Sequence, residues 1–147
     1  VKEPKNLLVK IGTPIRDLIE QCGGFSANSP GKIIAGGPMT GYTQFTLDTP
    51  ISKGVTGIIV LTEEEAKPEP ASPCIKCGKC LEVCPTHLEP LFISAYALKD
   101  RFEDAEKLNA LSCIECGSCS YICPAKRPLA ESIAHSKRQI KAKRRKS

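Results

Sequence analysis

The chain has 147 residues, of which 41% are hydrophobic and 25% charged, with nine cysteines and no tryptophan. This length allows one domain or two small ones, whose cores must be aliphatic because only 5% of the residues are aromatic. The net charge of +5 comes from residues 137–147, and the remainder has 14 basic against 16 acidic residues, which excludes a basic fold and gives no reason to expect nucleic acid as a partner.

Residues 1–66 are predicted to form a small α+β domain. Three apolar runs indicate strands, at residues 7–11, 32–35 and 55–61. After the first run, Thr13 is expected to cap a helix with Pro14 in its first turn, and glycines at 23–24 end it. The buried face of this helix is expected to carry Ile15, Leu18 and Ile19. One helix between short strands predicts a small β-grasp-like sheet packed on a helix.

This first domain shows no sign of catalytic chemistry. The glycine-rich segment 36–41 fits neither the phosphate-binding nor the dinucleotide-binding pattern, so we expect a tight turn or a close backbone approach there. Cys22 stands alone in the helical stretch and is expected to be a small buried hydrophobic residue. We predict no catalytic residue and no flavin or nicotinamide site.

A segment rich in proline and glutamate follows. Residues 63–73 contain three prolines and four glutamates and no large apolar residue. This composition is typical of an exposed linker, and it divides the chain at about residue 66. We therefore assign residues 67–73 to a linker.

Eight of the nine cysteines form two copies of the pattern C-x-x-C-x-x-C-x-x-x-C-P. This is the spacing of a ferredoxin with two [4Fe–4S] clusters, in which the fourth cysteine of each run ligates the other cluster. The predicted ligands of cluster one are Cys74, Cys77, Cys80 and Cys123. Those of cluster two are Cys113, Cys116, Cys119 and Cys84. Glycines at 78 and 117 are expected to relieve crowding beside the clusters.

Two other uses of the cysteines are less consistent with the pattern. A zinc site needs four ligands and would leave four well-spaced cysteines unused. A disulfide framework belongs to small secreted domains, and the sequence contains no signal peptide or transmembrane run. All eight cluster positions are filled by thiolates, so His87 and His135 are not needed as ligands. Cysteines kept reduced for iron indicate the cytoplasmic side.

Apolar residues between the cysteine runs recur at steps of three and four, which predicts one or two helices broken near Asp100. The predicted apolar set is Leu88, Leu91, Phe92, Ala95, Leu98, Phe102, Ala105, Leu108 and Leu111. Pro128 is expected to begin a last helix with Leu129, Ile133 and Ile140 facing inward. Residues 74–136 are therefore predicted to be an α-helical ferredoxin domain.

The sequence ends in a basic tail, residues 137–147, with seven Lys or Arg and no acidic residue. The tail is compatible with a solvated helix end, with contact to anionic lipid headgroups, or with an acidic protein partner. The sequence alone leaves these three roles open.

The order of these parts resembles the C subunit of the Rnf electron-transport complex. Four segments carry the resemblance: EPKNL at 3–7, IGTP at 11–14, GGPMTG at 36–41 and CIKCGKC at 74–80. The resemblance implies that the first domain is a soluble-ligand-binding β-grasp (SLBB) domain and that the eight cysteines bind clusters. It also implies a ferredoxin:NAD⁺ oxidoreductase that translocates Na⁺ or H⁺, with the other Rnf subunits as partners.

The family also has an N-terminal region that binds FMN and NADH, which this sequence lacks, so we expect a truncated chain that begins inside the β-grasp domain. The expected function is an electron relay in a peripheral subunit on the cytoplasmic side of the inner membrane. The alternative is a partner- or ligand-binding module in which the clusters are mainly structural. A complete soluble electron carrier is less consistent with the linker and the first domain.

Overall fold

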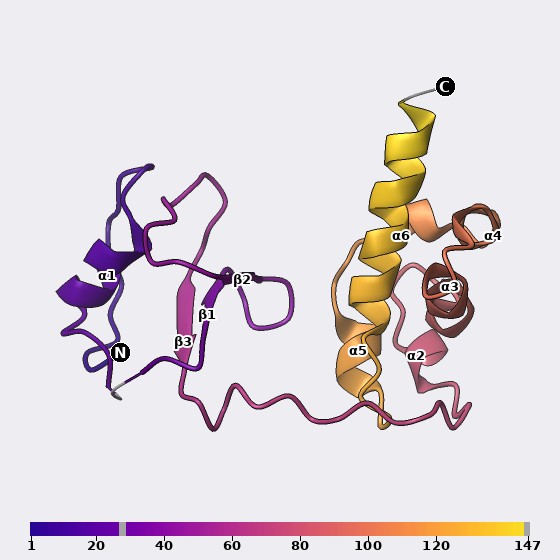
Figure 1. Cartoon of the computed structure of the whole chain (residues 1–147), viewed down its shortest axis with the longest axis horizontal. Helices are drawn as coiled ribbons and strands as arrows, with labels where there is room; N and C mark the ends of the chain where they lie inside the picture. Colours follow the sequence, from indigo (N-terminus) through magenta and orange to yellow (C-terminus); the bar gives the residue numbers. More distant parts are fainter. Residues whose placement is uncertain (27–28, 146–147) are drawn as a thin grey trace. The chain divides into compact units, whose positions relative to one another are not determined.

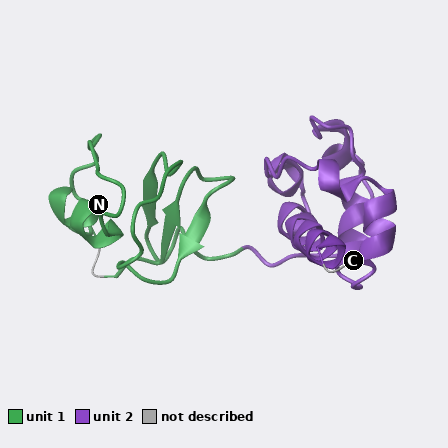
Figure 2. Cartoon of the chain, turned by 90° about the horizontal axis from the view of Figure 1, so that it is seen from above, with its two compact units in different colours: residues 1–68 green, residues 69–147 purple. Residues whose placement is uncertain are grey.

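The computed structural model of the protein describes residues 1–26 and 29–145. The chain divides into two compact units, Val1–Pro68 and Glu69–Ser147, which Figure 2 colours separately. The predicted linker, residues 67–73, is exposed and has no helix or strand, but Ser72 N–H donates to the Ala125 carbonyl of unit 2 at 3.0 Å. The fold is α+β, as predicted.

Unit 1 contains a three-stranded antiparallel sheet (Figure 1). Its strands are β1 (Lys32–Ala35), β2 (Tyr42–Gln44) and β3 (Ile58–Leu61), in the order β2-β1-β3. In the central strand, Ile34 is opposite Thr43 of β2 and Ile59 of β3. The strand predicted at 32–35 is confirmed, whereas β3 is shorter than the predicted 55–61 and β2 was not predicted.

Helix α1 (Ile15–Gln21) packs against this sheet. Ile15 and Ile19 of the helix form one apolar cluster with Ile33 of β1. The predicted cap is wrong, because the helix begins after Pro14 with no side-chain cap, and the Thr13 hydroxyl donates to the Lys10 carbonyl at 2.9 Å instead. Leu18 is only partly buried and is not part of this cluster.

The segment 7–11 is not a strand, which corrects the prediction. Pairing begins one residue later, where Gly12 N–H donates to the Ile51 carbonyl at 2.8 Å. A single antiparallel bridge follows between Pro14 and Pro50. Two hydrogen bonds flank it, from Ile51 N–H to the Thr13 carbonyl at 2.8 Å and from Ile15 N–H to the Thr49 carbonyl at 3.1 Å, so the facing prolines need no N–H of their own.

Two smaller predictions for unit 1 are confirmed. A Cβ atom on Gly41 would lie 2.5 Å from Ile34 Cγ2 and 2.6 Å from the Gly37 carbonyl oxygen, so the glycine-rich turn is a close backbone approach. Cys22 is buried, with 8% of its surface exposed.

Unit 2 is helical, as predicted. Its elements are α2 (Lys79–Glu82), α3 (Pro90–Ala97), α4 (Phe102–Lys107), the 3₁₀ helix η1 (Ala110–Ser112), α5 (Ser118–Ile122) and α6 (Leu129–Arg144). One apolar core joins α3, α4, η1 and α6, and it is formed by Leu88, Ile93, Ala105, Ala110, Ile133 and Ile140. The helical path is interrupted between α3 and α4 at Asp100, because a residue with a φ of 55° cannot continue a right-handed helix. The predicted break is therefore confirmed.

The predicted buried face of α3 is wrong. Phe92 and Leu98 are 49% and 56% exposed, whereas Ile93, Ser94 and Ala97 are buried. The small side chains let α6 approach closely, and the Ser132 hydroxyl of α6 donates to the Ser94 hydroxyl at 2.8 Å. A periodicity in large apolar residues does not reveal a face formed partly by small ones.

Helix α6 begins after Pro128, as predicted, and continues through the basic residues to Arg144. The expected boundary between residues 136 and 137 therefore lies inside this helix. Lys143 and Arg144 form ion pairs with Glu103 and Glu106 of α4. Part of the positive charge of the basic tail is therefore paired with acidic side chains within unit 2. In the part of the chain that the structure describes, no helix is long and apolar enough to cross a membrane.

Candidate iron-sulfur centres

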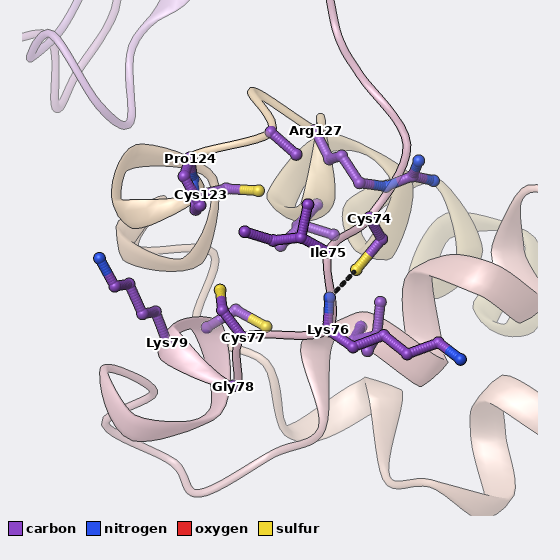
Figure 3. A pocket seen from close by; sticks show the side chains of 13 residues that line it. Cys74, Ile75, Lys76, Cys77, Gly78, Lys79, Cys123, Pro124 and Arg127 are labelled. Carbon is purple, nitrogen blue, oxygen red and sulfur yellow. Dashed lines mark hydrogen bonds between the residues drawn. The ribbon is translucent and has the colours of Figure 1, made fainter.

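The first cavity of unit 2 brings together cysteines from both runs. Its cysteines are Cys74, Cys77, Cys80 and Cys123. The first three lie in and after the loop that leads into α2, and Cys123 is the residue after α5. Figure 3 shows the sulfur of Cys123 on the far side of the pocket from the 74–80 loop, with its side chain directed into the space between them.

The second cavity has the complementary set. Its cysteines are Cys84, Cys113, Cys116 and Cys119. Cys84 follows α2, Cys113 and Cys116 lie in the loop that leads into α5, and Cys119 lies in the first turn of α5. The two cavities are similar in size. Each therefore combines three cysteines of one run with the fourth cysteine of the other.

The two loops have the same backbone conformation. Lys76 and Glu115, at equivalent positions of the two runs, have φ of 55° and 58°. Their N–H groups donate to Cys74 Sγ and Cys113 Sγ, both at 3.4 Å. A left-handed conformation is uncommon for residues other than glycine, and such outliers concentrate at functional sites. In both loops it aims a backbone donor at the first sulfur.

The glycines of the two loops serve a conformational purpose. Gly78 and Gly117 have φ of 81° and 80° and directly precede α2 and α5. An added Cβ on Gly78 would meet no protein atom within 4 Å, and the predicted relief of crowding beside the cluster stays a prediction. The left-handed conformation is the reason, because glycine adopts it without steric cost.

Hydrogen bonds and burial shift the pKa values of the cysteines in opposite directions. Burial raises the pKa of Cys84, but bonds from the Thr86 hydroxyl and from backbone N–H groups, including Leu88 N–H at 3.3 Å, outweigh it and lower this pKa. Burial raises the pKa of Cys119 to about 11 and also raises those of Cys113 and Cys80. A buried thiol that ionises with difficulty needs a metal to stabilise its thiolate.

Charged residues beside the cavities were not identified from the sequence. Arg127 lines the first cavity, and its Nε is buried with no hydrogen-bond partner among the described residues. Lys137 is 8% exposed, and its Nζ donates to the Cys113 carbonyl and to Glu115 Oε1, both at 2.5 Å. Lys137 belongs to a run of basic residues, and nothing in the sequence distinguishes it from the others, so its burial could not be predicted.

The donor sets fit iron–sulfur clusters. A [4Fe–4S] cluster takes four thiolates, each at a separate iron, and both cavities offer four cysteines and backbone N–H donors to sulfur. Among the residues that the structure describes, no three His, Cys, Asp or Glu side chains converge on one point, as a mononuclear site requires. His87 and His135 line neither cavity.

Comparison with known proteins identifies both units. Residues 1–43 match the SLBB domain, and residues 69–124 match the 4Fe-4S dicluster domain, which establishes two [4Fe–4S] clusters as the cofactors. The chain is 54% identical over 146 residues to the C subunit of the Na(+)-translocating ferredoxin:NAD(+) oxidoreductase complex of Acetobacterium woodii, covering 99% of the chain and 33% of that protein.

Two further relatives have related names. Identity is 51% over 143 residues with the C subunit of the proton-translocating ferredoxin:NAD(+) oxidoreductase complex of Clostridium ljungdahlii, covering 97% of the chain and 31% of that protein. The identity is 48% over 140 residues with the C subunit of the ion-translocating oxidoreductase complex of Methanosarcina acetivorans, covering 95% of the chain and 31% of that protein. The chain thus spans about a third of the length of the curated relatives it matches. The resemblance predicted from the sequence is confirmed.

Proposed function

We propose that this chain, which is homologous over nearly its whole length to part of the C subunit of ion-translocating ferredoxin:NAD⁺ oxidoreductase complexes, relays single electrons through its two clusters. One observation carries the proposal: two cavities of similar size each gather four cysteines, three from one run and one from the other. We assign cluster one to Cys74, Cys77, Cys80 and Cys123, and cluster two to Cys84, Cys113, Cys116 and Cys119. When bound, each cluster accepts and releases one electron at a time.

The protein contributes position and environment to this relay. The exchanged fourth positions tie the two cysteine runs into one unit, so the centres are kept at a fixed separation. Lys76 and Glu115 direct N–H groups at sulfur, which stabilises negative charge on the thiolates. Burial of Cys119 and the core packing of α6 limit access of water to the second site. No catalytic residue is needed for electron transfer.

In the complete complex we place this chain among the other subunits, at the cytoplasmic side of the inner membrane as a peripheral component. Residues 1–66 would be the β-grasp domain, 67–73 the linker and 74–136 the ferredoxin domain, followed by the basic end. The sites for FMN and NADH that the resemblance implies lie outside these parts. Oxidoreductase activity and ion translocation are properties of the whole complex.

The alternative from the sequence was a binding module with structural clusters. One feature of unit 1 favours a binding role, because an open, partly apolar groove is lined by the segment 4–9, by Leu18 of α1 and by residues 51–58. The ferredoxin spacing in unit 2 favours the relay. The two functions differ in whether the clusters change oxidation state reversibly.

Anaerobic purification followed by iron and sulfide analysis and redox titration monitored by EPR tests the proposal. We expect about eight iron atoms and eight sulfides per chain, and two centres that are reduced by one electron each. Zinc in place of iron, or a single iron centre, would contradict the assignment. Two intact clusters that do not cycle at accessible potentials would support the structural alternative.

A further inference from the structure

The two cluster sites differ in their access to solvent, and this difference has a consequence for the proposed relay. At the first site Cys77 is exposed and Gly78 is partly buried. At the second site the equivalent cysteine, Cys116, is partly buried, and Gly117 is buried. Electron transfer between proteins falls steeply with distance, so the more exposed site is the better point of exchange with an external partner.

The two sites also differ in charge. Lys76 and Lys79 line the first cavity, both are exposed, and neither has an ion-pair partner within residues 1–26 and 29–145. Figure 3 shows these two side chains extending away from the pocket in different directions. The equivalent positions of the second loop are Glu115, which Lys137 neutralises, and Ser118.

An apolar residue directly precedes Lys76 in the first loop. Ile75 is 66% exposed and lines the same cavity. Interfaces of this type have an apolar centre with a charged rim, and the rim charges determine the rate of association and the choice of partner. Ile114, the equivalent residue of the second loop, is 62% exposed. Apolar contact is therefore available at both sites, and charge distinguishes them.

We propose that the face formed by Ile75, Lys76, Cys77 and Lys79 docks a protein that carries a one-electron centre beneath an acidic surface. The inference rests on the proposed relay function and names the partner of its first site. One electron passes between the partner's centre and the centre held by Cys74, Cys77, Cys80 and Cys123. One of them is oxidised as the other is reduced, and no bond forms or breaks. An anionic lipid surface would also attract the lysines but has no use for an exposed redox site.

The test uses the chain with both clusters bound and an acidic plant-type [2Fe–2S] ferredoxin as the probe. Affinity for the oxidised ferredoxin is measured by calorimetry at about 30 mM and about 300 mM salt, because screening weakens exposed charge pairs. The rate of electron transfer from the reduced ferredoxin is measured by stopped flow. The variants are Lys76→Gln/Lys79→Gln and, as matched control, Lys99→Gln/Lys141→Gln. The control removes the same charge from exposed lysines that line neither cavity.

We expect Lys76→Gln/Lys79→Gln to lower both the affinity and the rate constant on the order of tenfold at low salt, with little remaining salt dependence. The control variant Lys99→Gln/Lys141→Gln should retain nearly all of the affinity and of the rate constant. Equal losses in the two pairs, or no loss in either, would overturn the inference. So would loss of binding to phosphatidylserine vesicles with unchanged binding of ferredoxin, because that result assigns the face to lipid.

The cluster content of every variant is measured first by EPR. Two reducible clusters without any dependence on Lys76 and Lys79 would overturn only this docking face. Absence of two reducible clusters from the unmodified chain would overturn the proposed function, and the docking face with it.

Discussion

The two cysteine loops of unit 2 have the same backbone and different surroundings. Both have a left-handed residue before the second cysteine and a left-handed glycine after it. The first loop is exposed and carries two exposed lysines, whereas the second is more buried and its glutamate is paired with Lys137. The comparison shows that cysteine spacing and glycine determine the shape of a cluster loop. Its exposure and charge depend on the helices around it, above all on α6.

The largest expected effect tests whether the loops exchange their fourth ligands. Cys84→Ser should abolish the cluster bound by Cys113, Cys116 and Cys119 and leave the other centre visible by EPR. Cys123→Ser should do the opposite. Iron analysis should show about half of the iron remaining in each variant.

Loss of the centre at Cys74, Cys77 and Cys80 in Cys84→Ser would contradict the exchange. Cys22→Ala is a suitable control, because Cys22 lies in unit 1 and lines neither cluster cavity. It should retain both EPR signals.

An intermediate effect tests the electrostatic difference between the loops. Lys137→Gln removes a buried cation beside the second site and should make the potential of that cluster more negative. Glu115→Gln removes the opposing anion and should make it less negative. Shifts on the order of tens of millivolts are expected from one charge at a partly buried site. EPR-monitored redox titration measures both.

The cluster of the first loop is the internal reference for this titration. Its potential should change much less in both variants. Shifts of the same sign in Lys137→Gln and Glu115→Gln would indicate a structural disturbance and not the charge effect.

The smallest expected effect compares the two glycines. Gly78→Ala and Gly117→Ala both place a side chain in a left-handed conformation, which costs about 1–2 kcal/mol. Gly78 has open space for a Cβ, whereas Gly117 is buried, so Gly117→Ala should destabilise the protein more. Thermal unfolding under anaerobic conditions measures the difference. Equal melting temperatures would show that burial of Gly117 is not important.

The features predicted well from the sequence are those that depend on local spacing. The cysteine pattern predicted two clusters, Asp100 marked the break between α3 and α4, and residues 32–35 form the central strand. The buried face of α3 was not predictable from large apolar residues, because Ser94 forms part of it. The burial of Lys137 depends on where α6 packs. A run of basic residues does not show which face of the helix is buried.

The crossing of the cysteine runs also affects how the protein is made. If Cys123 completes the first centre, that centre cannot be finished while only Cys74, Cys77 and Cys80 have left the ribosome. The cellular machinery that delivers iron and sulfide must then act on a chain synthesised beyond α5, or leave a provisional three-thiolate intermediate exposed to oxygen. Loading of the two sites therefore becomes a single late event in biogenesis, and a chain terminated before α5 would yield no stable cluster.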